Sequence, residues 1–386
     1  MDTAVAHTVG LLVAAIGVAI LARRLRLPYT VGLVIAGVGL AVSPMPIGIA
    51  LTQDFIFNVA LPPLLFEAAL VLPWPALRRD ALPILTLATL GTVIAAVVVA
   101  GGMVLCLGWA MPAAAIFGVL IAATDPVAVI AMFKDIGVKG RLRLLVESES
   151  LLNDGVAAVL FVLVLTAVGG GTPSAATAAM MLAVTAGGGI LVGLLCAGAA
   201  LLAGGRTADR MVETALTVVV AYGSFLGAEA LHLSGVLACV AAGLLMGNAS
   251  TLRQGFVTEF WDFAAFLANS LVFILIGVTL AHIPFTRLEA WALPAIIAIV
   301  LLGRAMTVYP LCLAFRWSRW PVPMREQHVL WWGGLRGALG LALALRLPEA
   351  MPDREPIVIA TFAVVAFSVV AQGGTMRPLL RRLGIL

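Results

Sequence analysis

The stretch Ala-Thr-Asp-Pro-Val-Ala-Val at residues 123–129, followed by Glu-Ser-Leu-Leu-Asn-Asp-Gly at 149–155, decides how this chain is interpreted. Both motifs lie inside apolar runs long enough to span a membrane, so Asp125 and Asp154 are expected within the hydrocarbon or in a cavity inside it. An aspartate at the centre of a bilayer costs about 2.5–3.5 kcal/mol on insertion scales. A chain that keeps two of them, beside Pro126 and Asn153, is interpreted as handling something charged. A small cation and a proton are the natural candidates.

The composition supports a membrane protein. Of the 386 residues, 62% are hydrophobic and 11% are charged, and the mean hydropathy is +1.13. Because about a quarter of the residues of a soluble domain are charged, a soluble globular protein is excluded. The four cysteines lack metal-ligand or disulfide spacing and are interpreted as packing residues. The first apolar run ends in Arg23 and Arg24 without a small-residue cleavage site, so no cleavable signal peptide is expected.

Apolar runs separated by turn and charged residues predict an all-α polytopic protein with about 13 transmembrane helices. The expected spans lie at roughly 7–22, 28–42, 54–73, 81–108, 112–133, 144–168, 175–203, 210–231, 234–247, 258–282, 290–315, 326–346 and 356–378. Most Lys and Arg residues fall in loops after odd-numbered spans, against only Arg287, Arg346 and Arg354 on the other side. The positive-inside rule then predicts a multi-pass protein of the inner (plasma) membrane, with the N-terminus outside and the C-terminus in the cytoplasm.

Five ionisable residues on five different spans are expected at one depth. A helical rise of about 1.5 Å per residue places them about 14–18 Å from the cytoplasmic loops, near the middle of a core about 30 Å thick. They are Glu67, Asp125, Asp154, Arg304 and Arg336. Three carboxylates and two guanidinium groups at one depth indicate a functional site near the middle of the membrane.

Two of these spans are expected to be broken. Pro126 lacks an N–H group, so its helix should stop near Thr124 and leave carbonyl oxygens free for a cation. The twelfth span carries several glycines around Arg336, within residues 333–340, and can also unwind. The two spans are seven helices apart, which is the offset expected for inverted repeats of spans one to six and eight to thirteen.

The sixth span presents two polar stripes. Ser150 and Asp154 are four residues apart and share a face, which offers hydroxyl and carboxylate oxygens to a hard cation. Glu149 and Asn153 form a second stripe about 100° away. Arg304 is the expected partner of Glu149, because an unpaired buried guanidinium would be severely destabilising.

The chain resembles the electroneutral sodium/proton exchangers, a branch of the monovalent cation:proton antiporters that includes archaeal, bacterial and animal members. The resemblance covers nearly the whole chain and is strongest in five places. These are Phe-Glu-Ala-Ala-Leu at 66–70, the two motifs at 123–129 and 149–155, Arg304, and Gly-Gly-Leu-Arg-Gly-Ala at 333–338.

The resemblance implies an inverted-repeat antiporter fold with two crossed, broken helices, in a homodimer. Residues 1–80 and 171–285 would form the scaffold and dimerisation helices, and residues 81–170 and 286–386 the ion-transporting core. It implies Na⁺ ligands at Asp154, Asp125, Ser150, the Thr124 carbonyl and Glu67, with Asn153, Glu149, Arg304 and Arg336 in support. The long cytoplasmic regulatory tail of some members is not expected. The electrogenic branch has an aspartate in place of Asn153, and commonly a lysine in place of Arg304.

The resulting hypothesis is an antiporter, not an enzyme, that exchanges one Na⁺ or Li⁺ for one proton, with both ions competing for Asp154. It needs no cofactor and no nucleic acid, and its partners are the cation, the proton, the bilayer and a second copy of the chain. A K⁺/H⁺ antiporter or K⁺ efflux system of the same fold is the alternative. A channel is disfavoured by the proline break, and an intramembrane aspartyl protease has no use for Glu67, Arg304 and Arg336.

Several roles have two interpretations. Asp125 could serve only as a helix-end cap, and Glu67 only as a scaffold contact. The Glu149–Arg304 pair is interpreted as structural rather than transporting. Arg336 either neutralises helix C-terminal dipoles or acts directly on the ion. In addition, Glu147 is expected to flank an entrance funnel, and Asp262 to be interfacial or structural.

Overall fold

The structure is a computed structural model that describes residues 28–42, 51–125, 140–170, 174–204, 209–249 and 254–386, with the short pieces 10, 13, 15–18, 20–21, 129–130, 133 and 137–138. Every regular element in these residues is helical. This is the expected outcome for an apolar chain, because a helix satisfies all its backbone hydrogen bonds internally where water is absent.

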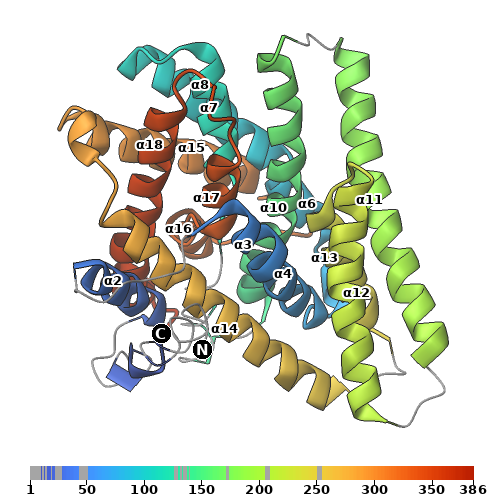
Figure 1. Cartoon of the computed structure of the whole chain (residues 1–386). Helices are drawn as coiled ribbons and strands as arrows, with labels where there is room; N and C mark the ends of the chain where they lie inside the picture. The colour runs from blue at the N-terminus through green and yellow to red at the C-terminus, as the bar shows by residue number, and fades with distance from the viewer. Residues whose placement is uncertain are drawn as a thin grey trace.

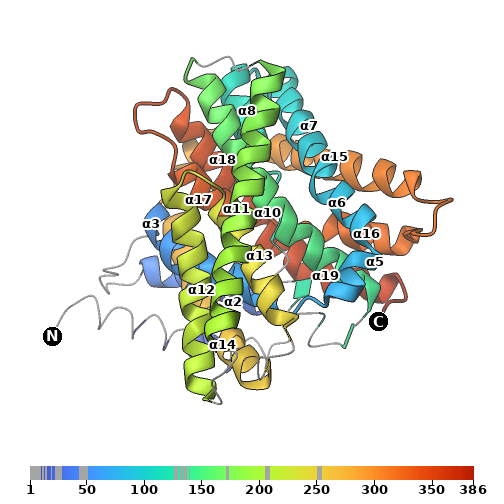
Figure 2. The same ribbon diagram turned by 90° about the vertical axis from the view of Figure 1, so that its right-hand side faces the viewer.

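The described helices follow the predicted spans from the second onward (Figures 1 and 2), whereas most of the first predicted span, residues 7–22, lies outside the described residues. The first part of the chain forms α2 (Tyr29–Val42), α3 (Gln53–Phe55), η1 (Ile56–Ala60), α4 (Leu61–Leu70), α5 (Trp74–Arg79), α6 (Ala81–Ala88), α7 (Leu90–Leu107), α8 (Met111–Leu120) and α10 (Arg141–Val168). The second part forms α11 (Ala175–Gly204), α12 (Arg210–Ala230), α13 (Gly235–Gly247), α14 (Gln254–Leu280), η2 (Phe285–Arg287), α15 (Ala292–Ala314), α16 (Met324–Trp332), α17 (Ala338–Leu345), α18 (Arg354–Phe367), η3 (Ser368–Gly373) and α19 (Gly374–Arg382). By length and composition, seven of the described helical segments could cross a membrane, and three shorter apolar helices accompany them.

Local sequence explains where several helices begin and end. Asp209 and Ser234 cap α12 and α13 by accepting hydrogen bonds from the amides of Met211 (2.8 Å) and Leu237 (3.2 Å). α7 ends at Gly108, which adopts a left-handed conformation with φ of 65°. In the third span, a π-helical turn at η1 precedes α4, an irregularity that its apolar pattern did not predict.

The helices pack in two sets. α4 contacts α13 and α14, α14 contacts α2, and α11, α12 and α13 contact one another. In the other set, α7 contacts α8 and α15, α10 contacts α6 and α8, and α17 contacts α18. α10 also touches α4, α11 and α13, so it lies between the sets. Figure 1 shows α10, α16 and α17 near the middle of the molecule, with α11 and α12 along one flank.

Candidate functional site

The two broken helices meet at their breaks. α8 ends at Leu120, and Thr124 and Asp125 are not helical. α16 ends at Trp332 and α17 begins only at Ala338. The amide of Asp125 donates a hydrogen bond of 2.7 Å to the carbonyl of Leu335 in the second break. The predicted breaks near Thr124 and around Arg336 are therefore confirmed, whereas Pro126 lies outside the described residues.

Arg336 closes the C-terminal end of the first half-helix. Its Nη1 donates to the carbonyl oxygens of Ala122 (2.8 Å) and Ala123 (3.0 Å), and the residue is buried. These carbonyls follow the last turn of α8, where the helix dipole is negative and no backbone amide is available. Of the two interpretations of Arg336, this geometry is that of dipole neutralisation.

Ser368 fixes the backbone of Arg336. Its Oγ accepts a hydrogen bond from the amide of Arg336 at 3.0 Å and lies 3.1 Å from the carbonyl of the same residue. Ser368 begins the π-helical segment η3, an irregularity of a kind that is frequent at functional sites. No sequence signal singled out this serine, since a serine in an apolar span is unremarkable without knowledge of its neighbours.

The predicted partner of Glu149 is confirmed. Arg304 and Glu149 form a two-pronged ion pair with N–O distances of 2.5 and 2.7 Å, and both residues are buried. The Nε and Nη2 atoms of Arg304 also donate to the carbonyl of Leu330, at 3.2 and 2.9 Å. One guanidinium thus neutralises a carboxylate of α10 and satisfies a carbonyl near the end of α16. A Cβ at Gly334 would lie 2.6 Å from the Arg304 Nε, so only glycine fits beside this pair.

The unwound segment of span five is held against α10 by polar side chains. Asn153 accepts from the Thr124 amide at 3.2 Å and donates to the Thr124 hydroxyl at 2.7 Å. The Ser150 hydroxyl donates to the Thr124 carbonyl. Two oxygens predicted as cation ligands are therefore hydrogen-bonded to each other in this structure.

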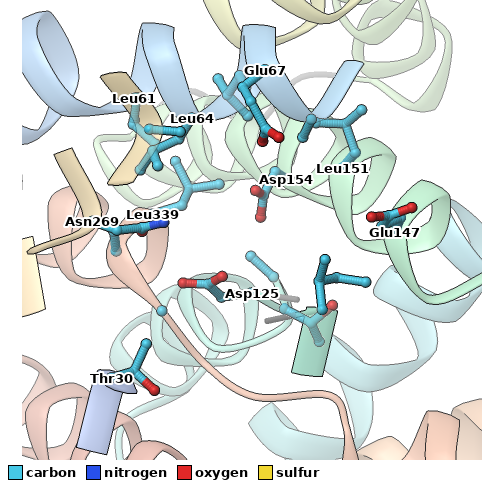
Figure 3. Close-up of a pocket in the computed structure, with 18 of the residues that line it drawn as sticks. Thr30, Leu61, Leu64, Glu67, Asp125, Glu147, Leu151, Asp154, Asn269 and Leu339 are labelled. Atoms are coloured by element: carbon cyan, nitrogen blue, oxygen red, sulfur yellow. The ribbon is translucent and has the colours of Figure 1, made fainter. Parts of the chain in front are cut away.

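A cavity of about 250 Å³ lies in front of this segment. Glu67 from α4, Asp125 from the break and Asp154 from α10 line it, and Figure 3 shows their carboxyl groups around one space. Each of the three is partly exposed. Ser150 does not line this cavity and instead lines a much smaller adjoining space with Thr124, which lines both.

The three carboxylates line the cavity but do not converge on a single point. Among the described residues, no three His, Cys, Asp or Glu side chains converge closely enough to hold a metal ion. Asp125 lies at the start of α17, since a Cβ on Gly337 would fall 2.0 Å from its Oδ2 atom. The positive end of that half-helix stabilises a negative charge there. The break after α8 thus places the Asp125 carboxylate at the start of α17. The break before α17 places Arg336 at the end of α8.

Sequence reasoning missed part of the cavity wall. Thr30 of α2 and Asn269 of α14 line it, together with Asp262, which was expected to be interfacial or structural. Asp262 is exposed as well as lining the cavity, which places it at the opening. The expected position of Glu147 beside the entrance agrees with its place in the lining. The α14 residues in the wall (Asp262, Ala265, Phe266 and Asn269) are three or four residues apart and so share one face of the helix. Their spacing alone does not show that this face borders the cavity, because it does not show how α14 is oriented against α4 and α10.

A membrane-spanning helical bundle with two broken helices that meet beside a cavity lined by carboxylates defines the class of secondary transporters with discontinuous helices. The chain belongs to the sodium/hydrogen exchanger family, because the family model described as "Sodium/hydrogen exchanger, transmembrane" matches residues 11–382.

Several proteins similar to this chain are named Na⁺/H⁺ antiporters. The chain is 38% identical over 350 residues to the Na⁺/H⁺ antiporter ApNhaP of Aphanothece halophytica, covering 88% of this chain and 66% of that protein. It is 37% identical to the Na⁺/H⁺ antiporter NhaG of Bacillus atrophaeus, covering 96% and 73%. It is 33% identical to the Na⁺/H⁺ antiporter NhaH of Halobacillus aidingensis, covering 86% and 84%. The chain thus spans about two thirds to five sixths of the length of these relatives.

A solved structure has the same fold. The sodium proton antiporter MjNhaP1 of Methanocaldococcus jannaschii at pH 8 superimposes with a TM-score of 0.76 at 22% identity, covering 98% of both chains. An electron-microscopy structure of the same protein gives a TM-score of 0.80. The predicted antiporter fold, with crossed and broken helices, is therefore confirmed.

Proposed function

We propose that this protein is a secondary antiporter that exchanges one Na⁺ (or Li⁺) for one proton, and that the two ions compete for Asp154. The observation that carries the proposal is the cavity onto which Asp154, Asp125 and Glu67 face, beside the meeting point of two broken helices, in a chain of this family. The relatives named above are sodium antiporters, and they give no support to the potassium alternative.

Competition for one carboxylate couples the two ions. A cation favours the charged form of Asp154, and a proton removes the charge that attracts the cation. Asp125, Glu67 and the Thr124 carbonyl would supply further oxygens, of the kind that hard monovalent cations prefer. The Ser150 hydroxyl would join them only after turning away from the Thr124 carbonyl. Because Asn153 does not ionise, one proton moves for each cation, and the exchange is electroneutral.

Alternating access would move the core against the scaffold. The core would comprise residues 81–170 and 286–386, and the scaffold residues 1–80 and 171–285, with dimerisation through the scaffold. The separate packing of α2, α4 and α11–α14 from most of the remaining helices supports this division. The distribution of Lys and Arg supports an inner-membrane protein with the N-terminus outside and the C-terminus in the cytoplasm.

A liposome assay tests the function directly. Purified protein is reconstituted into acid-loaded liposomes with an internal pH dye and challenged with Na⁺, Li⁺, K⁺ or choline. We expect Na⁺ and Li⁺ to raise the internal pH, and choline and protein-free liposomes to give no response. A response to K⁺ as large as that to Na⁺ would favour the potassium alternative. The absence of any cation-dependent response would refute the antiporter.

A further inference from the structure

A second polar cluster lies away from the ion cavity, at one surface of the bundle. Asp80 precedes the first residue of α6, Arg141 is the first residue of α10, and Trp320 lies in the loop between α15 and α16. The segments α6–α7, α10 and α15 are among those long and apolar enough to span the membrane. Since two of them begin and one ends at this cluster, it lies where the bundle meets the membrane surface. Figure 2 shows α5, α6 and α16 at this end of the molecule.

Hydrogen bonds around the buried Asp80 connect α5, the start of α10 and the α15–α16 loop. Asp80 is 2% exposed and accepts hydrogen bonds from the Nε atoms of Arg141 (2.7 Å) and Arg79 (3.3 Å). Arg141 Nη1 donates to the carbonyl of Pro321 at 2.6 Å. The indole N–H of Trp320 donates to the carbonyl of Arg79 at 2.8 Å. The polar cluster is therefore built from α5, the start of α10 and the α15–α16 loop.

The pocket beside this polar cluster has more positive side chains than the single carboxylate of Asp80 can neutralise. It has a volume of about 670 Å³, and its charged lining consists of Arg78, Arg79, Arg141, Arg319 and Asp80. Four arginines against one aspartate leave an excess of three positive charges. The Nη2 atom of Arg141 is buried and has no hydrogen-bond partner among the described residues. The Arg319 guanidinium lies 4.2 Å from the centre of the Trp320 ring, which holds it in position.

The surroundings indicate what the pocket binds. A planar guanidinium matches the oxygens of a phosphate group with two parallel hydrogen bonds. Exposed tryptophans (Trp74 and Trp317) flank the pocket in sequence, as is typical of the membrane–water interface. Leu82 and Leu85, on the first turns of α6, are about half exposed and would contact acyl chains. A basic pocket at the bilayer surface, with exposed apolar side chains on the neighbouring helix, favours a lipid over a soluble anion.

We propose that this pocket, lined by Arg78, Arg79, Arg141 and Arg319, binds the headgroup phosphate of an anionic phospholipid. The bound phosphate accepts hydrogen bonds from the guanidinium groups of Arg78 and Arg319, beside the positive charge of Arg141. It connects the start of α10, the helix that carries Asp154, to the loop that follows the helix of Arg304. The lipid therefore stabilises the folded bundle at this surface. The proposal concerns binding and stability alone, so it stands or falls independently of the transported ion.

Thermal unfolding in detergent tests the proposal. The probes are short-chain phosphatidylglycerol, short-chain phosphatidylcholine, glycerol 3-phosphate and inorganic phosphate, titrated into the purified protein. We expect phosphatidylglycerol to raise the unfolding temperature and the other three to have little effect. The variant Arg78→Gln/Arg319→Gln should weaken the apparent affinity for phosphatidylglycerol about fivefold per arginine, the factor that corresponds to one basic side chain at an anionic membrane surface.

The matched control is Arg381→Gln/Arg382→Gln, which removes two exposed arginines at the end of α19. It should bind phosphatidylglycerol as the wild type does. An equal loss in both variants would show a general surface-charge effect, and an equal response to inorganic phosphate would show a soluble-anion site; either result overturns the proposal. A measurement without variants is native mass spectrometry of wild-type protein extracted from mixed vesicles. Phosphatidylglycerol should be enriched among the retained lipids, and retention in the ratio of the vesicles would also overturn it.

Discussion

The amide of Asp125 is hydrogen-bonded to the carbonyl of Leu335 at 2.7 Å, and this bond joins the breaks of two helices that are more than 200 residues apart in the chain. The contact places Asp125 at the start of α17 and Arg336 at the end of α8. Each side chain thus compensates the partial charge at the end of a half-helix that belongs to the other span. A displacement of one break would therefore carry the other with it.

The first prediction concerns Asp154. The substitution Asp154→Asn keeps the size of the side chain but removes the ionisable group, so Na⁺-driven proton movement should fall to the rate of protein-free liposomes. The unfolding temperature should stay close to that of the wild type, because Asp154 faces a cavity and is partly exposed. Exchange at a rate comparable to the wild type would eliminate Asp154 as the shared carboxylate.

A second prediction concerns the Glu149–Arg304 pair. Removing either partner leaves an uncompensated buried charge, which costs about 3–5 kcal/mol. Glu149→Ala and Arg304→Ala should each unfold at a lower temperature, and the double variant should recover part of the loss. Thermal unfolding of the four proteins forms a double-mutant cycle. Strictly additive losses would mean that the two side chains do not stabilise each other.

The third prediction uses the close approach at the second break. Gly337→Ala would place a methyl group 2.0 Å from the Asp125 carboxylate, so the break has to shift. Forcing extra atoms into a packed site costs about 1–3 kcal/mol, and exchange should be strongly reduced. Gly101→Ala is the control, because no atom beyond the neighbouring backbone of its own helix lies within 4 Å of the added methyl. If Gly337→Ala exchanged ions as fast as Gly101→Ala, the geometry of this crossing would not matter for transport.

The fourth prediction follows from competition. Below the pKa of Asp154, each bound proton removes a cation site, so the apparent affinity for Na⁺ should weaken about tenfold per pH unit. Above that pKa the affinity should become independent of pH. Initial rates of Na⁺-driven proton movement over a range of pH values measure both regimes. A constant affinity across the whole range would show that the two ions do not share a carboxylate.

The fifth prediction concerns charge balance. If Asp154 alone carries the proton, one cycle moves no net charge. Clamping the vesicle potential with valinomycin and K⁺ should then leave the initial Na⁺-driven rate nearly unchanged, provided that K⁺ is not itself transported. A steep dependence on voltage would indicate a second proton, and the variant Asp125→Asn would then show whether Asp125 carries it.

The sequence predicted the helical spans well, since an apolar run of sufficient length is helical in a membrane whatever its neighbours are. It also predicted both breaks, from Pro126 and from the glycines around Arg336, and the pairing of Arg304 with Glu149. That pair was predictable because an unpaired buried guanidinium would be severely destabilising, and Glu149 on the sixth span offered a carboxylate.

The arrangement around the cavity was less predictable. Depth along the membrane follows from residue counting, because each residue advances a helix by about 1.5 Å. The rotation of each helix and its lateral neighbours do not follow from counting. For this reason the hydrogen bond between Ser150 and Thr124, the contact of Ser368 with Arg336, and the place of Asp262 in the cavity wall were not foreseen.

By itself, the sequence determined that this is a polytopic helical protein with two interrupted spans and ionisable residues at mid-depth, because hydropathy, proline and glycine act locally. Only the tertiary structure decided which of those residues meet. Packing brings Glu67, Asp125 and Asp154 onto one cavity and sets Glu149 and Arg304 behind it. It also joins Asp80 to Arg141 at the bundle surface. These pairings depend on how side chains of distant helices fit together, and no local pattern encodes that fit.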